Sequence, residues 1–324
     1  MAAIFGRRSA GVSGAGRDAK RRARGRAAGL LLAGGLAAAA GMPAGAVTLT
    51  DGSGRTVTVA DTGRIVAVGG TVTEILWDLG LGDRIVAVDS TSLYPPEALK
   101  TKADIGYMRQ LSPEGVLAER PSVIIADGDS GPPPAIDVLA ASTVPLVLIE
   151  AAKTPQAIPA RVRLIAEAVG QQDRGEGLVR EIEAGFARLD AARARVKRPA
   201  RALFVLSMRN GQPMVAGSGT AADGALKLAG LENVAAGIEG YKPMTEEAIV
   251  GAAPEVIVMM NHGPDGLSAD EVFAMPAFRL VPAAKDRRFV KVDGLALLGF
   301  GPRTAAAALE LCGAVDPACT AAAP

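Results

Sequence analysis

Short apolar runs alternate with helical patterns from residue 65 onward. Four runs of apolar residues predict buried strands: Ile65–Val68, Ile85–Val88, Val123–Ala126 and Val144–Ile149. Three helical patterns separate them: Thr71–Leu79, Pro113–Glu119 and Ile136–Ala141. Such alternation is typical of a parallel sheet covered by helices. Before it, Val47–Val59 alternates weakly around Asp51–Gly54, which predicts a hairpin.

The second half of the chain repeats the first. LSPEGVLAERPSVII, from Leu111, matches MTEEAIVGAAPEVIV, from Met244, at a constant offset of 133 residues (244 minus 111). The match aligns Glu114 with Glu247, and the segment Tyr94-Pro95 has its nearest counterpart in Tyr241-Lys242-Pro243. We therefore expect two similar lobes, each with a tyrosine-bearing loop at a shared cleft.

A helical segment connects the two halves. Residues 155–198 are rich in Ala, Glu, Arg and Leu, with an interruption predicted near Gly170–Gly177. About 20 helical residues span roughly 30 Å, enough to bridge two lobes. We predict an α/β fold of two similar lobes (47–154 and 199–324), each with a mostly parallel sheet flanked by helices. One long helix joins the lobes, and a ligand cleft lies between them.

Residues 1–46 have the pattern of an export signal. A basic leader precedes the apolar stretch Ala27–Gly41, and Ala44-Gly45-Ala46 is a small-x-small cleavage pattern, so the mature chain is expected to begin at Val47. The apolar stretch is about 15 residues, shorter than the roughly 20 of a membrane span. A retained signal anchor is the alternative. The expected location is the periplasm, and the export route (Sec or twin-arginine) stays open.

Composition narrows the possible chemistry. The formal net charge is +1, which gives no basic field for nucleic acid. The single histidine argues against a zinc or manganese site, which would need several. Cys312 and Cys319 are the only cysteines, and in an oxidising compartment they are expected to form a disulfide, with two free thiols as the alternative.

The stretch from Asp89 to Asp127 holds the first candidate site residues. It begins at the carboxyl end of the strand Ile85–Val88 and carries Tyr94, Tyr107 and Arg109. Ligands of open α/β sheets bind beyond the carboxyl ends of the strands. We therefore expect this stretch to contact a ligand.

Longer motifs give the sequence a resemblance to a known family. GGTVTEILWDLGLGDRIVAVDSTSLYPPEA, DIGYMRQLSPEGVLAERPSVIIA, GTAADGALKLAGLENV and GYKPMT resemble periplasmic haemin-binding proteins of ATP-driven (ABC) importers, over about residues 63 to 312. The first half is also similar to cobalamin and siderophore binders. The YPPEA and GYMRQLS pieces favour haem.

The resemblance implies a haem site. Tyr94 would ligate the ferric iron, since a phenolate is a hard oxygen donor and a known haem ligand. A phenolate at neutral pH needs a nearby cation, and cations also pair with propionates. The further pocket candidates are Arg109, Arg209, Lys242, Tyr241, Tyr107, Met244 and His262. His262 would be a second axial ligand, a wall residue or an ordinary loop residue. Met208, Met214 and Phe300 would line the pocket or pack in the core.

Two glutamates are candidates for docking to the importer. Glu114 and Glu247 each lie near the second position of a helix, after Ser112 and Thr245 as N-caps. Complementing the helix dipole is a sufficient reason for an acidic residue there. The repeat, however, places one on each lobe, and in similar importers such carboxylates bind arginines of the permease subunits.

The expected protein is therefore a monomeric binding protein, not an enzyme. It would take haem b as transported ligand, receive it indirectly from an outer-membrane haem receptor and deliver it to an ABC permease. A siderophore or corrinoid binder of the same fold is the alternative. An exported hydrolase is a third possibility, but Gly217-Ser218-Gly219 lacks the Gly-x-Ser-x-Gly pattern.

Overall fold

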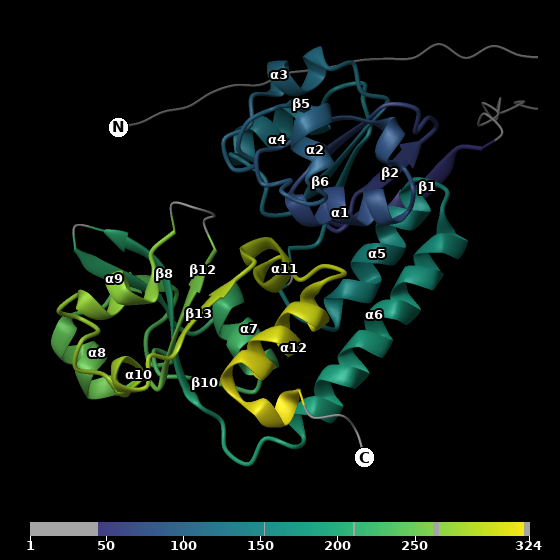
Figure 1. Cartoon of the computed structure of the whole chain (residues 1–324). Coiled ribbons are helices and arrows are strands. Elements are labelled where there is room, and N and C mark those ends of the chain that lie inside the picture. Colours follow the sequence, from purple (N-terminus) through teal and green to yellow (C-terminus); the bar gives the residue numbers. More distant parts are fainter. Residues whose placement is uncertain (1–44, 152, 210, 262–265, 321–324) are drawn as a thin grey trace, which may run out of the picture. The chain divides into compact units, whose positions relative to one another are not determined.

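The computed structural model describes residues 45–151, 153–209, 211–261 and 266–320 (Figure 1). The described residues all belong to one compact unit, Met42–Pro324. Residues 1–44 of the predicted export signal and His262 lie outside the described residues. No helix of the described ranges combines the length and apolar character that crossing a bilayer requires.

The N-terminal lobe contains a five-stranded parallel sheet in the order β5-β4-β3-β6-β7. Its strands are β3 (Ile65–Val68), β4 (Ile85–Val88), β5 (Ala103–Asp104), β6 (Val123–Asp127) and β7 (Leu146–Ile149). Its helices are α1 (Gly70–Asp78), α2 (Glu97–Thr101), α3 (Pro113–Ala118) and α4 (Pro133–Ala140). Central strands of a parallel sheet are buried on both faces, so continuous apolar runs predicted them well. β7 begins two residues later than predicted, because Pro145 has no N–H to donate to a ladder.

The predicted hairpin is present as β1 (Val47–Thr50) and β2 (Thr56–Val59). Its turn residue Asp51 accepts hydrogen bonds from the backbone N–H groups of Ser53 (2.9 Å) and Arg55 (3.0 Å). The N–H of Leu148 in β7 also donates to Asp51, at 3.3 Å. This one carboxylate therefore ties the hairpin to the sheet of the lobe.

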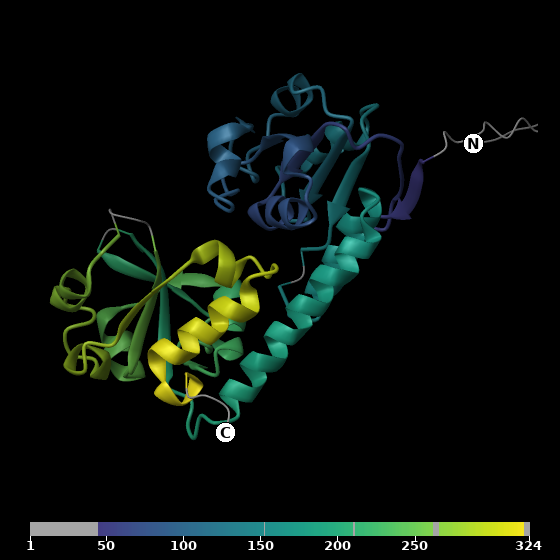
Figure 2. The ribbon, with the colours of Figure 1, turned by 45° about the vertical axis from the view of Figure 1, so that its right-hand side comes forward.

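Two helices, α5 (Ala157–Ala168) and α6 (Gln172–Arg193), form the connecting segment. The predicted interruption is present at Gly170, between α5 and α6, but its extension to Gly177 is wrong, because α6 runs without a break through Gly175. A Cβ at Gly175 would lie 2.5 Å from the Cβ of Ala166, so glycine lets α6 pack closely against α5. Val179 and Ile182 join the N-terminal core and Leu189 joins the C-terminal core, so α6 spans both lobes (Figure 2).

The C-terminal lobe contains a mixed sheet in the order β11-β9-β8-β12-β13, with β10 beside β8. The strands are β8 (Arg201–Arg209), β9 (Gln212–Ala216), β10 (Glu232–Asn233), β11 (Tyr241–Pro243), β12 (Val256–Met260) and β13 (Phe289–Val292). The helices are α7 (Ala221–Leu228), α8 (Glu246–Ala252), α9 (Ala269–Ala274), α10 (Pro282–Lys285), α11 (Gly294–Leu298) and α12 (Thr304–Val315). The two-lobed α/β architecture is thus confirmed, although β9 and β11 run antiparallel to their neighbours.

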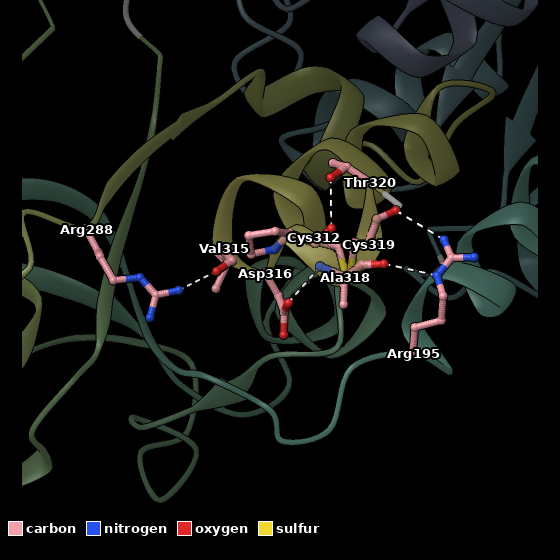
Figure 3. The surroundings of a disulfide bond; sticks show 9 residues. Arg195, Arg288, Cys312, Val315, Asp316, Ala318, Cys319 and Thr320 are labelled. Carbon is pink, nitrogen blue, oxygen red and sulfur yellow. Dashed lines mark hydrogen bonds between the residues drawn. A yellow bond between two sulfur atoms is a disulfide. The ribbon is translucent and has the colours of Figure 1, made fainter. Parts of the chain in front are cut away.

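A disulfide links Cys312 in α12 to Cys319, so the cysteines are not two free thiols. Arg195, just after α6, donates from Nε to the carbonyl of Ala318 (3.0 Å) and from Nη2 to that of Cys319 (3.4 Å) (Figure 3). The disulfide loop therefore holds the end of the connecting helix against the C-terminal lobe.

Candidate functional site

A cavity of about 890 Å³ is lined by residues of both lobes. Thr71 and Thr91 are among the residues of its N-terminal wall, and Leu206, Thr220 and Leu295 are among those of its C-terminal wall. Pockets for small molecules and cofactors typically enclose about 300–1,000 Å³. Several lining residues, such as Thr91, Asp129 and Thr71, follow the carboxyl ends of strands or begin helices, which is the position expected for a ligand site in this fold class.

The N-terminal wall carries a cluster of opposite charges. Arg109 Nη2 lies 3.4 Å from an oxygen of Asp129, and Lys153 Nζ lies 3.5 Å from the same carboxylate. Lys153 also lies 3.6 Å from Asp127, the buried last residue of β6. Two cations therefore share Asp129, so an anionic ligand group can bind one of them while the other keeps its partner.

The C-terminal wall is mainly apolar. Leu206 comes from β8, Met260 from β12, and Leu295 and Leu298 from α11. Soft and branched apolar side chains of this kind suit a flat, apolar ligand face. The cavity therefore offers charge on one side and an apolar surface on the other.

Two tyrosines line the cavity from opposite lobes. Tyr107 precedes α3 and Tyr241 precedes α8, and the glycine before each has a positive φ (84° at Gly106, 74° at Gly240). Arg109 Nη1 donates to the hydroxyl of Tyr107 at 2.9 Å. By position the counterpart of Tyr241 is Tyr107, and not the Tyr94 segment that the repeat suggested. Glycine in the left-handed region was the missed signal, because Gly-Tyr precedes the matched helix in both halves.

The hydroxyl of Tyr241 lies near the start of α7. Partial burial raises the pKa of Tyr241, while hydrogen bonds from the Ala222 N–H and from Thr220 act in the opposite direction. The positive charge of Arg109, in the other lobe, also opposes this rise in the pKa of Tyr241. Tyr241 therefore faces the charged wall across the cavity.

Tyr94 lies in the loop after β4, which the buried Asp89 organises. Asp89 accepts hydrogen bonds from the N–H groups of Gly69 (2.7 Å) and Thr91 (2.9 Å). Tyr94 is 37% exposed and is not among the residues lining the 890 Å³ cavity. The guanidinium carbon of Arg303, from the other lobe, lies 3.8 Å from the centre of its ring. Tyr94 is therefore at the boundary between the lobes, beside the cavity.

Four other predicted pocket residues lie elsewhere among the described residues. Arg209 ends β8 three residues beyond Leu206, about 10 Å further along the strand. Lys242 follows Tyr241 in β11, and neighbouring strand residues point to opposite faces. Met244 is 8% exposed and packs in the core of the C-terminal lobe. Phe300 is 1% exposed and joins the N-terminal core.

The predicted loop methionines are also placed differently. Met208 lies in β8 and Met214 in β9, because these strands form a longer antiparallel hairpin than the sequence pattern indicated. Within the described ranges, no group of three or more His, Cys, Asp or Glu side chains is placed to hold a metal ion.

Glu114 and Glu247 occupy equivalent places on the two lobes. Each is exposed in the first turn of its helix, after an N-cap hydroxyl that accepts a backbone hydrogen bond. Its own backbone N–H, followed by the Ser112 hydroxyl, lowers the pKa of Glu114. Its own N–H and Thr245 lower the pKa of Glu247 in the same way. Both carboxylates are therefore ionised and held by their helix ends.

Sequence reasoning missed Asp127, Asp129 and Lys153. Asp127 directly follows the predicted strand Val123–Ala126 and is the last residue of β6, and Lys153 follows the end of β7. Ligands of open α/β sheets bind beyond the carboxyl ends of the strands, and this rule located the stretch that contains Tyr94. Applied to every strand end, it would also have found these three residues. Arg303 had no such signal, because it comes from a turn between two helices.

Comparisons with known proteins give a consistent result. A family model described as periplasmic binding protein matches residues 65–294. The apo structure of the periplasmic haem-binding protein RhuT from Roseiflexus sp. RS-1 is 35% identical, with a TM-score of 0.75, over 80% of this chain and 100% of that chain. An uncharacterised ABC transporter substrate-binding lipoprotein of Bacillus subtilis (strain 168) is 27% identical over 84% of this chain and 86% of its own. The vitamin B12-binding protein of Pectobacterium carotovorum subsp. carotovorum (strain PC1) is 26% identical over 77% and 87%, respectively.

Proposed function

The chain belongs to the periplasmic binding protein family, and on that premise we propose that it captures haem between its lobes and delivers it to an ABC importer. The role is binding and delivery in the periplasm, after export by the signal in residues 1–46. The similarity to RhuT, a haem-binding protein, supports haem as the ligand. The similarity to an ABC transporter substrate-binding protein supports the permease as the partner.

The two-sided chemistry of the cavity is the observation that carries the proposal. Haem has a flat apolar ring and two carboxylates at one edge. Arg109 and Lys153 on one wall suit the carboxylates, because a cation donating to a carboxylate forms a strong hydrogen bond. Leu206, Met260 and Leu298 on the other wall suit the ring face.

We assign the iron to Tyr94. It lies in the YPP loop that resembles the haem binders, its side chain is accessible, and it lies at the boundary of the lobes. Tyr107 and Tyr241 line the cavity itself and are the competing ligands. Each of the three tyrosines can be replaced by phenylalanine in turn. The absorption spectrum of the haemin complex then shows which tyrosine binds the iron, because only its replacement removes the ferric-phenolate spectrum.

Delivery depends on the exposed carboxylates of Glu114 and Glu247. They are ionised, fixed at helix ends and present once on each lobe, which is the arrangement needed to dock on two similar permease subunits. The protein acts as a monomer in this scheme and receives haem released by an outer-membrane receptor.

A corrinoid or siderophore binder is the second candidate, favoured by the likeness to the vitamin B12-binding protein. Titration with haemin, cyanocobalamin and a ferric siderophore distinguishes the candidates. A haem binder shows saturable spectral changes with haemin and does not bind cyanocobalamin or the ferric siderophore. Tighter binding of cyanocobalamin or the siderophore than of haemin would show that the protein is a corrinoid or siderophore binder.

A further inference from the structure

Asp129 pairs with both cations of the charged cavity wall through one oxygen. Arg109 Nη2 lies 3.4 Å from Oδ2 of Asp129, and Lys153 Nζ lies 3.5 Å from the same atom. All three side chains line the 890 Å³ cavity. Oδ2 of Asp129 therefore occupies the position at which a carboxylate of a bound ligand would meet the two cations.

The two contacts of Asp129 are weak. Strong charge-assisted hydrogen bonds are about 2.7–2.9 Å long, and one in the same lobe joins Arg55 Nη2 to Asp51 Oδ2 at 2.7 Å. Both contacts of Asp129 are longer, and its side chain is 37% exposed. Ion pairs with this much exposure contribute little, because water competes for both partners. Little free energy is therefore lost when the carboxylate of Asp129 leaves the two cations.

The backbone of Asp129 is held independently of its side chain. Its N–H donates to Oδ1 of Asp127 at 3.0 Å, and the N–H of Gly128 donates to the carbonyl of Ile149 at 2.7 Å. Among the described residues, Arg109 alone donates a hydrogen bond to the carboxylate of Asp129. A change of side-chain rotamer is therefore enough to move this carboxylate away from the cations.

Neither cation loses all its partners when Asp129 turns away. Lys153 Nζ also lies 3.6 Å from Oδ2 of Asp127, whose side chain is only 5% exposed. Arg109 Nη1 donates to the hydroxyl of Tyr107 at 2.9 Å. Asp127 and Tyr107 therefore keep the two cations at the cavity while their third partner changes.

We propose that Asp129 is a specificity-determining residue of the cavity: its carboxylate competes with the carboxylates of the ligand for Arg109 and Lys153. The inference rests on the proposed function and adds to it what sets the strength with which the charged edge of the ligand is held. A ligand with carboxylates has to replace Asp129, whereas a ligand without them leaves Asp129 in place. Asp129 therefore lowers the preference of the cavity for ligands that carry carboxylates.

Titration of Asp129→Asn with haemin and with haemin dimethyl ester tests the inference. Asp129→Asn removes the competing charge, so it should bind haemin roughly three- to tenfold more tightly than the wild type does. The dimethyl ester, whose two carboxylates are esterified, should bind both proteins equally. Asp129→Glu keeps the charge and should show no such gain. Asp137→Asn is the control, because it removes a negative charge from an exposed position of the same lobe outside the cavity.

A double-mutant cycle separates competition for the cations from direct repulsion of the ligand. In a protein that already carries Arg109→Gln and Lys153→Gln, Asp129→Asn should tighten haemin binding less than it does in the wild type. An equal or larger gain in that background would mean that Asp129 repels the ligand directly, and it would overturn the inference.

Three further results would also overturn the inference while haem binding stands. These are an unchanged haemin affinity of Asp129→Asn, an equal gain for the dimethyl ester, and an equal gain in Asp137→Asn. A wild-type protein that binds no haemin overturns both the inference and the proposed function. Thermal unfolding shows whether each variant is folded, and Asp129→Ser, with the same expected gain, provides the test if Asp129→Asn is not.

Discussion

The two lobes share an arrangement of secondary structure but place different side chains at the cavity. Each lobe places a Gly-Tyr pair before a capped helix whose first turn carries an exposed glutamate. Between the lobes, however, the N-terminal wall holds Arg109 and Lys153, while the C-terminal wall is mainly leucine and methionine. In the proposed function, the symmetric glutamates are the docking surface, and the asymmetric cavity suits a ligand that has one charged edge and one apolar face.

The largest effect should come from removing the symmetric carboxylates. Glu114→Gln with Glu247→Gln should lower import at limiting protein roughly 100-fold, with each single change lowering it about tenfold, because each removes one charge-assisted contact. Import into vesicles that contain the permease measures this, and haemin affinity should not change. Glu97→Gln, an exposed glutamate at another helix start, is the control. If only one of the two single variants lowered import, docking through both lobes would be contradicted.

The charged wall should account for the next largest effect. Arg109→Gln with Lys153→Gln should weaken haemin binding by roughly 10- to 100-fold, since hydrogen bonds to charged groups contribute about 1.5–3 kcal/mol. Haemin dimethyl ester, which has no carboxylates, should show no such loss. Lys242→Gln serves as control, because Lys242 is exposed outside the cavity. Equal losses for both ligands would mean that the wall does not recognise carboxylates.

The two lobes are also stabilised by different interactions, and the stability of the C-terminal lobe should depend on redox conditions. Replacing Cys312 and Cys319 by alanine should lower the free energy of unfolding by about 2.5 kcal/mol, as expected for a short closed loop. Urea denaturation with and without reductant measures it. Reductant should shift the wild-type midpoint and leave the variant unchanged; an unaffected wild type would contradict the prediction.

The N-terminal lobe should respond to acid instead. Burial acts to raise the pKa of Asp51, but hydrogen bonds from Ser53, Arg55 and Leu148 prevail and lower it from 3.8 to about 2. The stabilisation is therefore complete above about pH 5 and disappears as the pH falls towards 2. Asp51→Asn should lower the free energy of unfolding at pH 7 by about 2 kcal/mol. The difference from wild type should close at pH 2, with the exposed Asp137→Asn as a control that changes little; a constant difference would refute the assignment.

The pattern of apolar residues predicted the strands of the fold well, for a clear physical reason. Strands such as β3 and β4 are buried on both faces, so they must be continuously apolar, and their bounds could be read directly. The longer helix α6 was misjudged at Gly175, because a glycine that allows two helices to approach looks the same in sequence as one that ends a helix.

The site was predictable only in part. Tyr107, Arg109 and Tyr241 follow strand or repeat signals and do line the cavity. Lys242 was misplaced because strand alternation turns it away from its neighbour Tyr241. Arg303 meets Glu74 across 229 positions of sequence, and no local pattern encodes a contact that depends on how two lobes come together.

The most direct test of the central claim is the absorption spectrum of the protein titrated with haemin, with and without Tyr94→Phe. The account predicts a saturable ferric-phenolate spectrum in the wild type that is lost in Tyr94→Phe, while Tyr107→Phe and Tyr241→Phe retain it. A spectrum that survives Tyr94→Phe and disappears with Tyr107→Phe or Tyr241→Phe would assign the iron to a tyrosine that lines the cavity and contradict the assignment of Tyr94.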